Sequence, residues 1–194
     1  MSLKQHDFPS YAAAAAAAYD MLKETRNQGL RPVLLVPHYE AALRERRALA
    51  ERDCAFGVTV ATPAEWFAEL WQLFGDGRTI VSSETRHIAI EHRAKEQRGE
   101  RATPGMIDVL LQATDQALCF IDAPAQNTPF APSEEEAIAL LRTYRDKIHA
   151  HGLIEAVEAY PIFTAQTKKF QALYAPVLLG CIDANLSVAA SEFL

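Results

Sequence analysis

Two stretches decide the fold, Val33-Leu-Leu-Val-Pro-His38 and Gly57-Val-Thr-Val-Ala-Thr-Pro-Ala-Glu-Trp-Phe67. Each begins with an apolar run typical of a buried strand, and each leads directly into a segment with helical signals. Such strand–helix units build parallel α/β sheets, because two parallel strands need a crossover between them. In these folds the loops at the carboxyl ends of the strands commonly bind phosphates. The two stretches therefore predict an α/β fold with a possible ligand-binding edge.

The helix after the second strand has the clearest start signal in the chain. Thr62-Pro63-Ala64-Glu65 combines an N-cap residue, proline at the first helical position and glutamate at the third. The apolar residues that follow form two adjacent lines, so we expect this helix to be covered on more than one side. The first line is Trp66, Leu70 and Leu73, and the second is Phe67, Trp71 and Phe74.

Strand and helix signals alternate at first and then become helical from Pro104 until a last strand. This order predicts a sheet interrupted by a helical insertion, with an α/β domain over 1–83 and 175–194 and the insertion over 84–174. Leu43, Leu49 and Ala50 are expected to face the core, and Ser133 is expected to begin a capping box. The predicted strands are 31–37, 57–61, 79–81 and 176–180, and the predicted helices are 11–28, 39–53, 63–74, 83–97, 105–121, 133–150 and 153–172.

Composition sets broad limits on the class of protein. The chain has 194 residues, of which 49% are hydrophobic, so it can bury a sizeable core. No apolar run reaches the roughly 20 residues that a membrane span needs, and we expect no membrane contact. Cys54, Cys119 and Cys181 stand far apart and are interpreted as buried free thiols, which indicates a cytoplasmic location.

The negative charge lies in the second half of the chain. Residues 1–104 hold 14 Lys or Arg and 14 Asp or Glu, whereas residues 105–194 hold 5 and 11, which accounts for the net charge of −6. Neutralisation of phosphates supplies most non-specific affinity for DNA, so an acidic chain binds DNA weakly as a whole. Any contact with nucleic acid is therefore expected to be local and to lie in the first half.

Four segments resemble UvrD-like superfamily-one helicases. Residues 33–42 and 58–67 resemble successive strand–helix units of that family, residues 77–86 resemble the segment that introduces its helical 1B insertion, and Val177-Leu-Leu-Gly-Cys-Ile-Asp183 stands where the family has its Walker B strand. In this order and spacing the segments are most similar to the amino-terminal region of AddB/RexB-type helicase–nuclease subunits. The resemblance implies a RecA-like (P-loop NTPase-like) parallel sheet flanked by helices, with an all-helical insertion.

The chain departs from that family at both ATP motifs. A Walker A loop needs glycines, lysine and Ser/Thr to hold phosphates and Mg²⁺, and His6-Asp-Phe-Pro-Ser-Tyr-Ala12 has no glycine and no lysine. The Walker B position needs an acidic pair, but it is Gly180-Cys181, with Asp183 displaced. We therefore expect this segment to have lost ATP and Mg²⁺ binding, to use no cofactor and to be inactive as an ATPase. The alternative is that the amino terminus is the capping helix of a different fold.

Basic residues suggest where DNA would bind. The resemblance implies a sheet face that follows single-stranded DNA, where basic side chains contact the backbone and aromatic rings stack on bases. The alternative is a solvated helix face, which is favoured by the interspersed glutamates Glu40, Glu45, Glu51 and Glu91. Both tryptophans, Trp66 and Trp71, are interpreted as core residues rather than as stacking platforms. The candidate DNA contacts are His38, Arg44, Arg46, Arg47, Thr62 and Arg86.

No motif indicates a catalytic or metal site. His87 and His92 are five residues apart, which does not place them on one helix face, and no HExxH or Cys/His cluster accompanies them. There is no G-x-S-x-G elbow. The sequence predicts neither a catalytic constellation nor a metal centre.

Two functions from different classes remain open. The first is a non-catalytic helicase-like module of an ATP-dependent helicase–nuclease in DNA repair and recombination, a scaffold whose partners are the rest of its own polypeptide, a sister helicase–nuclease subunit and single-stranded DNA. The second is a small stand-alone α/β enzyme or binding domain that acts on a phosphorylated ligand; a stand-alone interaction domain is a third. We expect a fragment of a longer protein, because the last strand lies close to Leu194 and Met1-Ser-Leu3 resembles a cloning remnant. The resemblance implies that the parent protein is a PD-(D/E)XK exonuclease or helicase subunit.

Overall fold

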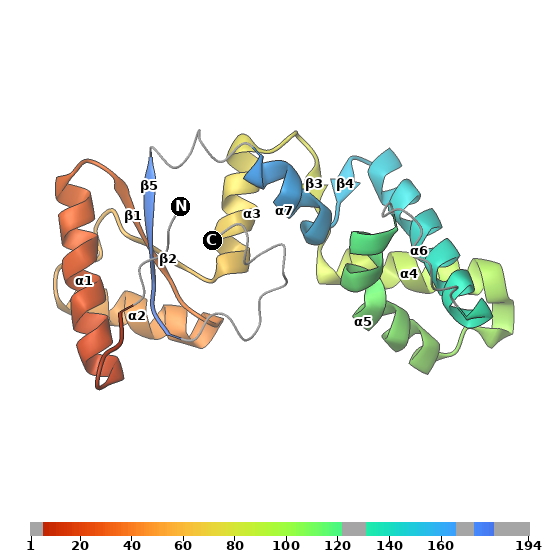
Figure 1. Ribbon diagram of the computed structural model, residues 1–194, viewed down its shortest axis with the longest axis horizontal. Helices are drawn as coiled ribbons and strands as arrows, with labels where there is room; N and C mark the ends of the chain where they lie inside the picture. Colours follow the sequence, from red (N-terminus) through yellow and green to blue (C-terminus); the bar gives the residue numbers. More distant parts are fainter. Residues whose placement is uncertain (1–5, 122–130, 166–172, 181–194) are drawn as a thin grey trace. The chain divides into compact units, whose positions relative to one another are not determined.

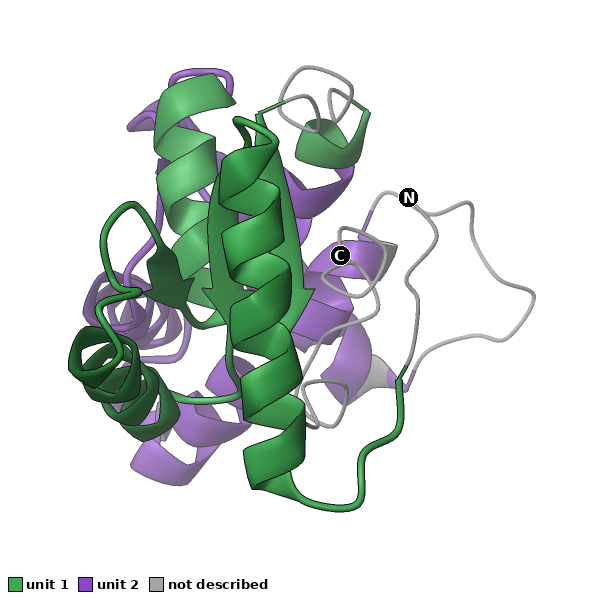
Figure 2. Ribbon diagram, turned by 90° about the vertical axis from the view of Figure 1, so that its left-hand side faces the viewer, with its two compact units in different colours: residues 1–74, 162–194 green, residues 75–161 purple. Residues whose placement is uncertain are grey.

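The computed structural model describes residues 6–121, 131–165 and 173–180. These residues belong to two compact units, which are coloured separately in Figure 2. Unit 1 comprises residues 1–74 and 162–194, and unit 2 comprises residues 75–161. In the described part of the chain no helix is long and apolar enough to cross a membrane.

The boundaries of the units differ from the predicted ones for two reasons. β3 (Thr79–Ile80), which was expected in the α/β domain, pairs in parallel with β4 (Leu153–Ile154) and so belongs to the helical unit. At the other boundary, the Phe163 ring packs edge-to-face on Phe67 with a centroid distance of 5.6 Å. Residue 163 therefore belongs to unit 1 rather than to the insertion.

Unit 1 contains the predicted parallel sheet. β1 (Arg31–Leu35) lies between β2 (Thr59–Ala61) and β5 (Tyr174–Leu178), and both pairings are parallel. Val33 is opposite Thr59 on one side and Pro176 on the other. Since β1 is the central strand, its apolar residues are buried, as the sequence predicted. The class is mixed α/β with a small parallel sheet.

Helices flank both sides of this sheet (Figure 1). On one face, α1 (Tyr11–Asn27) and α2 (Tyr39–Glu51) form an apolar cluster with alternate strand residues that include Leu34 and Val60. The alanines of α1 suit this position, because they combine the best helix propensity with small size against the sheet. Ser10 caps α1 by accepting a hydrogen bond from the amide of Ala13 at 3.2 Å.

α3 (Pro63–Phe74) belongs to the same unit and is covered on more than one side, as predicted. Trp66 contacts Tyr174 of β5 at 6.4 Å between ring centroids, and Trp71 contacts Phe163 of α7 (Ala156–Thr164) at 6.2 Å. Both tryptophans are buried core residues. Each fully buried large side chain contributes roughly 1.5–3 kcal/mol relative to an exposed one. The predicted position of Leu73 was wrong, because its side chain is 58% exposed.

Unit 2 is mainly helical. Its helices are α4 (Ser83–Arg98), α5 (Pro104–Phe120), α6 (Pro132–Ala150) and the first part of α7, with a short 3₁₀ turn at Gly99–Arg101. Ser82 caps α4, and Thr103 followed by Pro104 begins α5. Apolar residues of α4, α5 and α6, with Val81 and Val157, form one buried cluster.

Two predicted elements of unit 2 were wrong. The helix expected over 153–172 is replaced by β4 and then α7, which ends at Thr164; residues 166–172 lie outside the described part. Gly152, at φ +70°, makes the turn that separates α6 from β4. Ser133 does not begin the capping box, because α6 begins one residue earlier and the Glu134 carboxylate accepts the amide of Ala131 at 2.7 Å.

Candidate functional site

The carboxyl edge of the sheet in unit 1 is the place where a ligand of this class of fold would bind. His38 follows β1 and begins α2 in an extended conformation. Its Nδ1 accepts the amide of Ala41 at 3.2 Å and also lies 3.0 Å from a Glu40 carboxylate oxygen. One nitrogen cannot accept from an amide and donate to a carboxylate at once, so the two contacts belong to different tautomers of the ring. His38 is first of all the cap of its own helix.

Thr62 follows β2 and has the same kind of local role. Its amide and its hydroxyl donate to the Glu65 carboxylate at 2.9 and 3.1 Å, and the Glu65 amide donates to Thr62 Oγ1 at 3.3 Å. This reciprocal pattern is the predicted capping box. The hydroxyl group that was a candidate DNA contact is therefore engaged within the chain.

Glycine is required where β5 ends. Gly180 has φ +101°, and a Cβ built on it would lie 3.2 Å from Pro37 Cγ. The neighbouring residues are tied together, because the amide of Leu179 donates to the carbonyl of Leu35 at 2.9 Å. Residues 181–183, which the resemblance places at the Walker B position, lie outside the described part.

Acidic residues occupy the two helix N-termini at this edge. Glu40 lies in the first turn of α2, and the Glu65 carboxylate accepts the Thr62 amide at the start of α3. A helix N-terminus attracts anions through its unpaired amides and its dipole. At both ends the chain supplies its own carboxylate, which repels a phosphate from the same place. The edge is therefore poorly suited to hold phosphate groups.

The three candidate arginines of α2 have different environments. Arg44 donates to Glu45 Oε1 at 3.1 Å and to Tyr11 Oη at 2.8 Å, and its guanidinium lies 4.7 Å from the centre of the Tyr11 ring. Arg46 donates to the Val60 carbonyl at 2.6 Å, on the strand that ends the described sheet. Arg47 is exposed and has no hydrogen bond or ion pair with another described residue. Of the three, Arg47 alone presents its charge to solvent without such a contact.

Glu45 is a buried charged residue whose position the sequence analysis did not predict. It was interpreted as part of a solvated face, but it is 1% exposed. Its carboxylate accepts from Tyr11 at 2.7 Å, from Tyr19 at 2.5 Å and from Arg44 at 3.1 Å. Burial tends to raise the pKa of Glu45, but the hydrogen bonds from these three side chains hold it below its usual value. Burial and the bond to Glu45 raise the pKa of Tyr19.

The predicted core face of α2 was right for Leu49 but wrong for Leu43 and Ala50. Leu43 is 47% exposed and Ala50 is exposed, whereas the buried residues of this helix are Ala41, Ala42, Glu45 and Leu49. The spacing of Ala41, Glu45 and Leu49 by four residues is the signal that would have placed Glu45 on the inner face.

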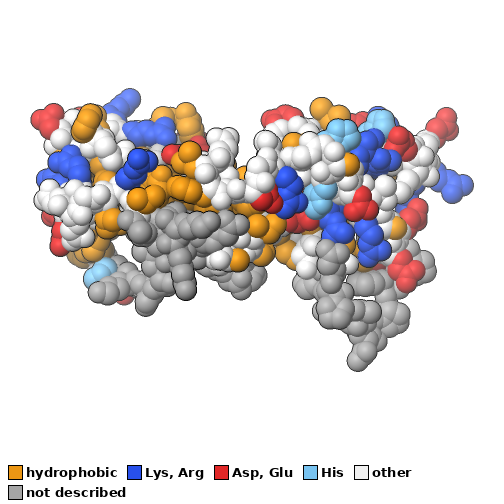
Figure 3. Space-filling model, turned by 90° about the horizontal axis from the view of Figure 1, so that it is seen from above, with side chains coloured by type: hydrophobic (Ala, Val, Ile, Leu, Met, Phe, Trp, Pro, Cys, Tyr) orange, Lys and Arg blue, Asp and Glu red, His pale blue; other side chains and the backbone are white. Residues whose placement is uncertain are grey.

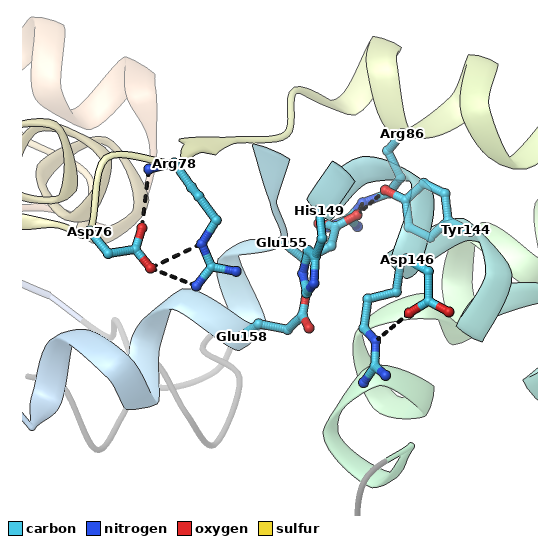
Figure 4. A network of polar contacts seen from close by, with 9 residues as sticks. Asp76, Arg78, Arg86, Tyr144, Asp146, His149, Glu155 and Glu158 are labelled. Carbon is cyan, nitrogen blue, oxygen red and sulfur yellow. Dashed lines mark hydrogen bonds and ion pairs between the residues drawn. The ribbon is translucent and has the colours of Figure 1, made fainter. Parts of the chain in front are cut away.

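Arg86, unlike the other candidates, belongs to unit 2, where it lies on α4 and forms ion pairs. Its Nε donates to Glu155 Oε1 at 2.9 Å, its Nη2 also donates to Glu155, and Asp115 lies 3.1 Å from Nη2. Tyr144 donates its hydroxyl to the same Glu155 carboxylate, and Figure 4 shows both side chains pointing toward it. Glu155 is fully buried. The four residues connect α4, α5, α6 and the end of β4.

The charges of this network determine its chemistry. Burial tends to lower the pKa of Arg86, but the hydrogen bonds and charge of Glu155 raise it overall. Burial and the bond to Glu155 raise the pKa of Tyr144. Tyr144 therefore stays protonated and Arg86 charged at neutral pH, so neither acts as a proton-transfer group there. The arrangement is a structural ion pair with a tyrosine donor.

Two further polar pairs lie near this network in Figure 4. Arg78 donates through Nε and Nη2 to Asp76 Oδ2 at 2.9 and 2.6 Å, which lowers the pKa of Asp76. His149 Nε2 lies 3.1 Å from Glu158 Oε2. The first pair lies within the loop before β3, and the second joins the end of α6 to α7.

The cysteines and other metal-binding side chains form no centre within the described ranges. Cys54 is half-buried and Cys119 is exposed, and both are free thiols, so the expectation of burial was wrong for Cys119; Cys181 lies outside the described part. No three His, Cys, Asp or Glu side chains of the described residues are placed to hold a metal ion together.

The candidate DNA contacts thus divide by unit. Five of the candidates lie in unit 1, namely His38, Thr62, Arg44, Arg46 and Arg47, and Arg86 lies in unit 2.

Comparison of the chain with models of protein families, with curated proteins and with solved structures found no match in any of the three.

Proposed function

We propose that this chain is a non-catalytic, helicase-like module of an ATP-dependent DNA helicase–nuclease that serves double-strand-break repair and recombination in the cytoplasm. It acts as a RecA-like scaffold, with the rest of its polypeptide and a sister helicase–nuclease subunit as partners. Single-stranded DNA contacts it locally. ATP and Mg²⁺ are not bound by this segment.

One observation carries the proposal, namely the order of the elements around the small parallel sheet. β1 and β2 each lead into a helix through a short capped connection, and β5 pairs with β1 only after all of unit 2 has intervened. A strand–helix repeat interrupted by a helical segment is the order that the resemblance to AddB/RexB-type subunits implies. Unit 2 takes the place of the 1B-like insertion in this proposal.

The carboxyl edge of the sheet supports the non-catalytic part. Glu40 and Glu65 place carboxylates at the two helix N-termini, and residues 6–10 before α1 contain neither glycine nor lysine. These features oppose the alternative of a stand-alone enzyme or binding domain for a phosphorylated ligand, because such a ligand needs unpaired amides and positive charge.

The first experiment is calorimetric titration of the chain with ATP and Mg²⁺. No heat of binding is expected at nucleotide concentrations up to roughly 1 mM. Micromolar affinity would refute the loss of the phosphate site. Reading the gene beyond codon 194 tests the larger claim: helicase-like sequence followed by a PD-(D/E)XK pattern is expected, and a stop codon at that point would contradict it.

The DNA contact is tested separately by fluorescence anisotropy with a labelled oligothymidine. Arg47→Ala is expected to lower affinity by about two- to fivefold and to reduce the salt dependence of binding, because an exposed phosphate contact is lost. Arg46→Ala is the matched control, since its guanidinium is already bound to Val60. A larger loss of affinity with Arg46→Ala than with Arg47→Ala would count against the assignment.

A further inference from the structure

A groove between α4 and α6 lies entirely within unit 2. It encloses about 300 Å³ of open space. Three aliphatic residues line it, namely Ile88 and Ala89 from α4 and Ile148 from α6. Three basic residues border them, namely His92, Arg93 and Lys147. We refer to this surface, defined by these six residues, as the α4–α6 groove.

The aliphatic part of the groove is accessible. Ile88 is 67% exposed, although it belongs to a helix whose other outward positions are mainly charged or polar. Ile148 is 4% exposed and joins the groove to the buried core of the unit. Together the two isoleucines give the groove an aliphatic floor that an apolar side chain of a partner can cover.

The basic residues of the groove are incompletely paired. Lys147 is exposed and forms no ion pair with another described residue. Arg93 donates through Nη1 to Glu96 at 2.6 Å, but its Nε is buried without an acceptor among the described residues. His92 Nδ1 lies 3.5 Å from the same Glu96 carboxylate. Glu96 therefore neutralises one charge, and the groove keeps an excess of positive charge in a chain whose net charge is −6.

The spacing of these residues is that of one helical turn. On α4, Ile88 precedes His92 by four residues, and Ala89 precedes Arg93 by four. Residues four apart lie about 6 Å from one another on the same face. A ligand that fits both features has an apolar side chain and a negative charge separated by about one turn, which is the pattern of an acidic amphipathic helix.

We propose that the α4–α6 groove binds an amphipathic helix of a partner protein, with an aliphatic side chain on Ile88 and Ile148. A carboxylate one turn away lies against the basic border of the groove, which is formed by His92, Arg93 and Lys147. A nucleic acid fits less well, because bases stack on exposed aromatic faces. The aromatic lining residue, Tyr144, is 1% exposed, and its hydroxyl is bound to Glu155. This assignment does not rest on the proposed helicase-like function.

Two short synthetic helices that differ only in charge test the proposal. Both carry leucines on one face; one carries glutamate a turn away, and the other carries lysine at the same positions. Fluorescence anisotropy with the full chain is expected to show at least about tenfold tighter binding of the glutamate peptide, since opposite charges meet across the groove. Equal affinity for the two peptides, or no binding of the glutamate peptide at roughly 1 mM, would overturn the proposal.

Three variants locate the binding. Lys147→Glu is expected to reverse the preference between the two peptides, and Ile88→Asp is expected to weaken both by about tenfold or more. Lys95→Glu is the control, because Lys95 is an exposed residue of α4 that pairs with Glu91 and does not line the groove. All three positions are exposed or at the surface, and circular dichroism checks that each variant is folded. Unchanged peptide binding in Lys147→Glu refutes the proposal. The proposal is also refuted if the chain binds oligothymidine but not the glutamate peptide, and Lys147→Glu abolishes the binding of oligothymidine.

Figure 3 shows Lys, Arg and His side chains, with interspersed Asp and Glu, on the surface of unit 2 that faces the viewer at the right. Such a mixed surface binds many anions weakly. The weakening of both peptides by Ile88→Asp is therefore the decisive measurement, because an added negative charge alone would weaken the glutamate peptide and strengthen the lysine peptide.

Discussion

Substituting leucine for Glu155 removes a fully buried carboxylate that accepts hydrogen bonds from Arg86 and Tyr144. The substitution tests the conclusion that Arg86, a candidate DNA contact, holds unit 2 together. Removing one partner of a buried ion pair costs about 3–5 kcal/mol of unfolding free energy, since the other charge stays without compensation. The Tyr144 hydroxyl also loses its acceptor, which costs about 1–3 kcal/mol.

Two features of the structure reduce that sum. Asp115 remains 3.1 Å from Arg86 Nη2, and the Arg86 side chain is 22% exposed, so water and a second carboxylate partly compensate its charge. We therefore expect Glu155→Leu to lower the unfolding free energy by about 3 kcal/mol. In the double variant with Arg86→Met no buried charge is left unpaired, because Asp115, which loses its partner, is 52% exposed to water. The double variant is expected to recover all but about 1 kcal/mol, which is the loss from the remaining Tyr144 hydroxyl.

Urea unfolding measures these differences with two probes. Far-UV circular dichroism follows the helices of both units, whereas the chain has 2 tryptophans, Trp66 and Trp71, and both lie on α3 of unit 1. A lower midpoint at unchanged slope is expected in the dichroism signal, and a smaller shift in tryptophan fluorescence. A change below about 0.5 kcal/mol in Glu155→Leu, or a double variant that is as unstable as the single one, would refute the structural role of the pair.

Three more predictions concern unit 1. The pKa of Glu45 is lowered in the folded chain, so its carboxylate stabilises the fold fully at neutral pH, and this contribution is lost as the pH falls through the folded-state pKa. Glu45→Gln is therefore expected to flatten the pH dependence of the urea midpoint between roughly pH 7 and pH 3. An equal pH dependence in both proteins would contradict this. Phe163→Ala is expected to lower the unfolding free energy by about 3 kcal/mol and to change the emission of Trp71, because the Phe163 ring contacts that of Trp71. Leu73→Ala, at an exposed position, is expected to change the unfolding free energy by less than about 0.5 kcal/mol. Similar losses in the two variants would show that the packing on α3 is not as described. Thr62→Ala removes the cap of α3 and is expected to cost about 1 kcal/mol in thermal or urea unfolding, and an unchanged stability would mean that the capping box contributes nothing.

Local signals in the sequence predicted the elements that depend on local chemistry. Thr62 to Glu65 formed the expected capping box, and Ser10 began α1 where it was expected. Four of the five described strands were predicted in their right places, although β1, β2 and β3 are shorter than expected and β5 begins and ends two residues earlier. Each of these features involves residues within a turn of one another or a run of apolar residues. Such features are readable before any tertiary contact is known.

Features that depend on distant partners were not predicted. β4 has only two residues, and Leu153 and Ile154 are extended because they pair with Thr79 and Ile80. Arg86 and Glu155 are 69 residues apart in the sequence, so their pairing leaves no local pattern. Glu45 was assigned to the surface by its charge, although its helical position is that of a core residue. In each case a tertiary contact outweighed the local preference.

The placement of β1 in the middle of the sheet has a consequence for synthesis of the chain. β1 gains β5 as a partner only after all of unit 2 has been translated, because the pairing joins Arg31 to Tyr174. Unit 2 is one continuous segment and can fold as soon as it emerges, whereas one edge of β1 stays open with its apolar side chains nearby. A nascent chain that pauses in this interval presents that strand edge to other chains and to chaperones. The return of β5 is thus the step that closes this edge of β1.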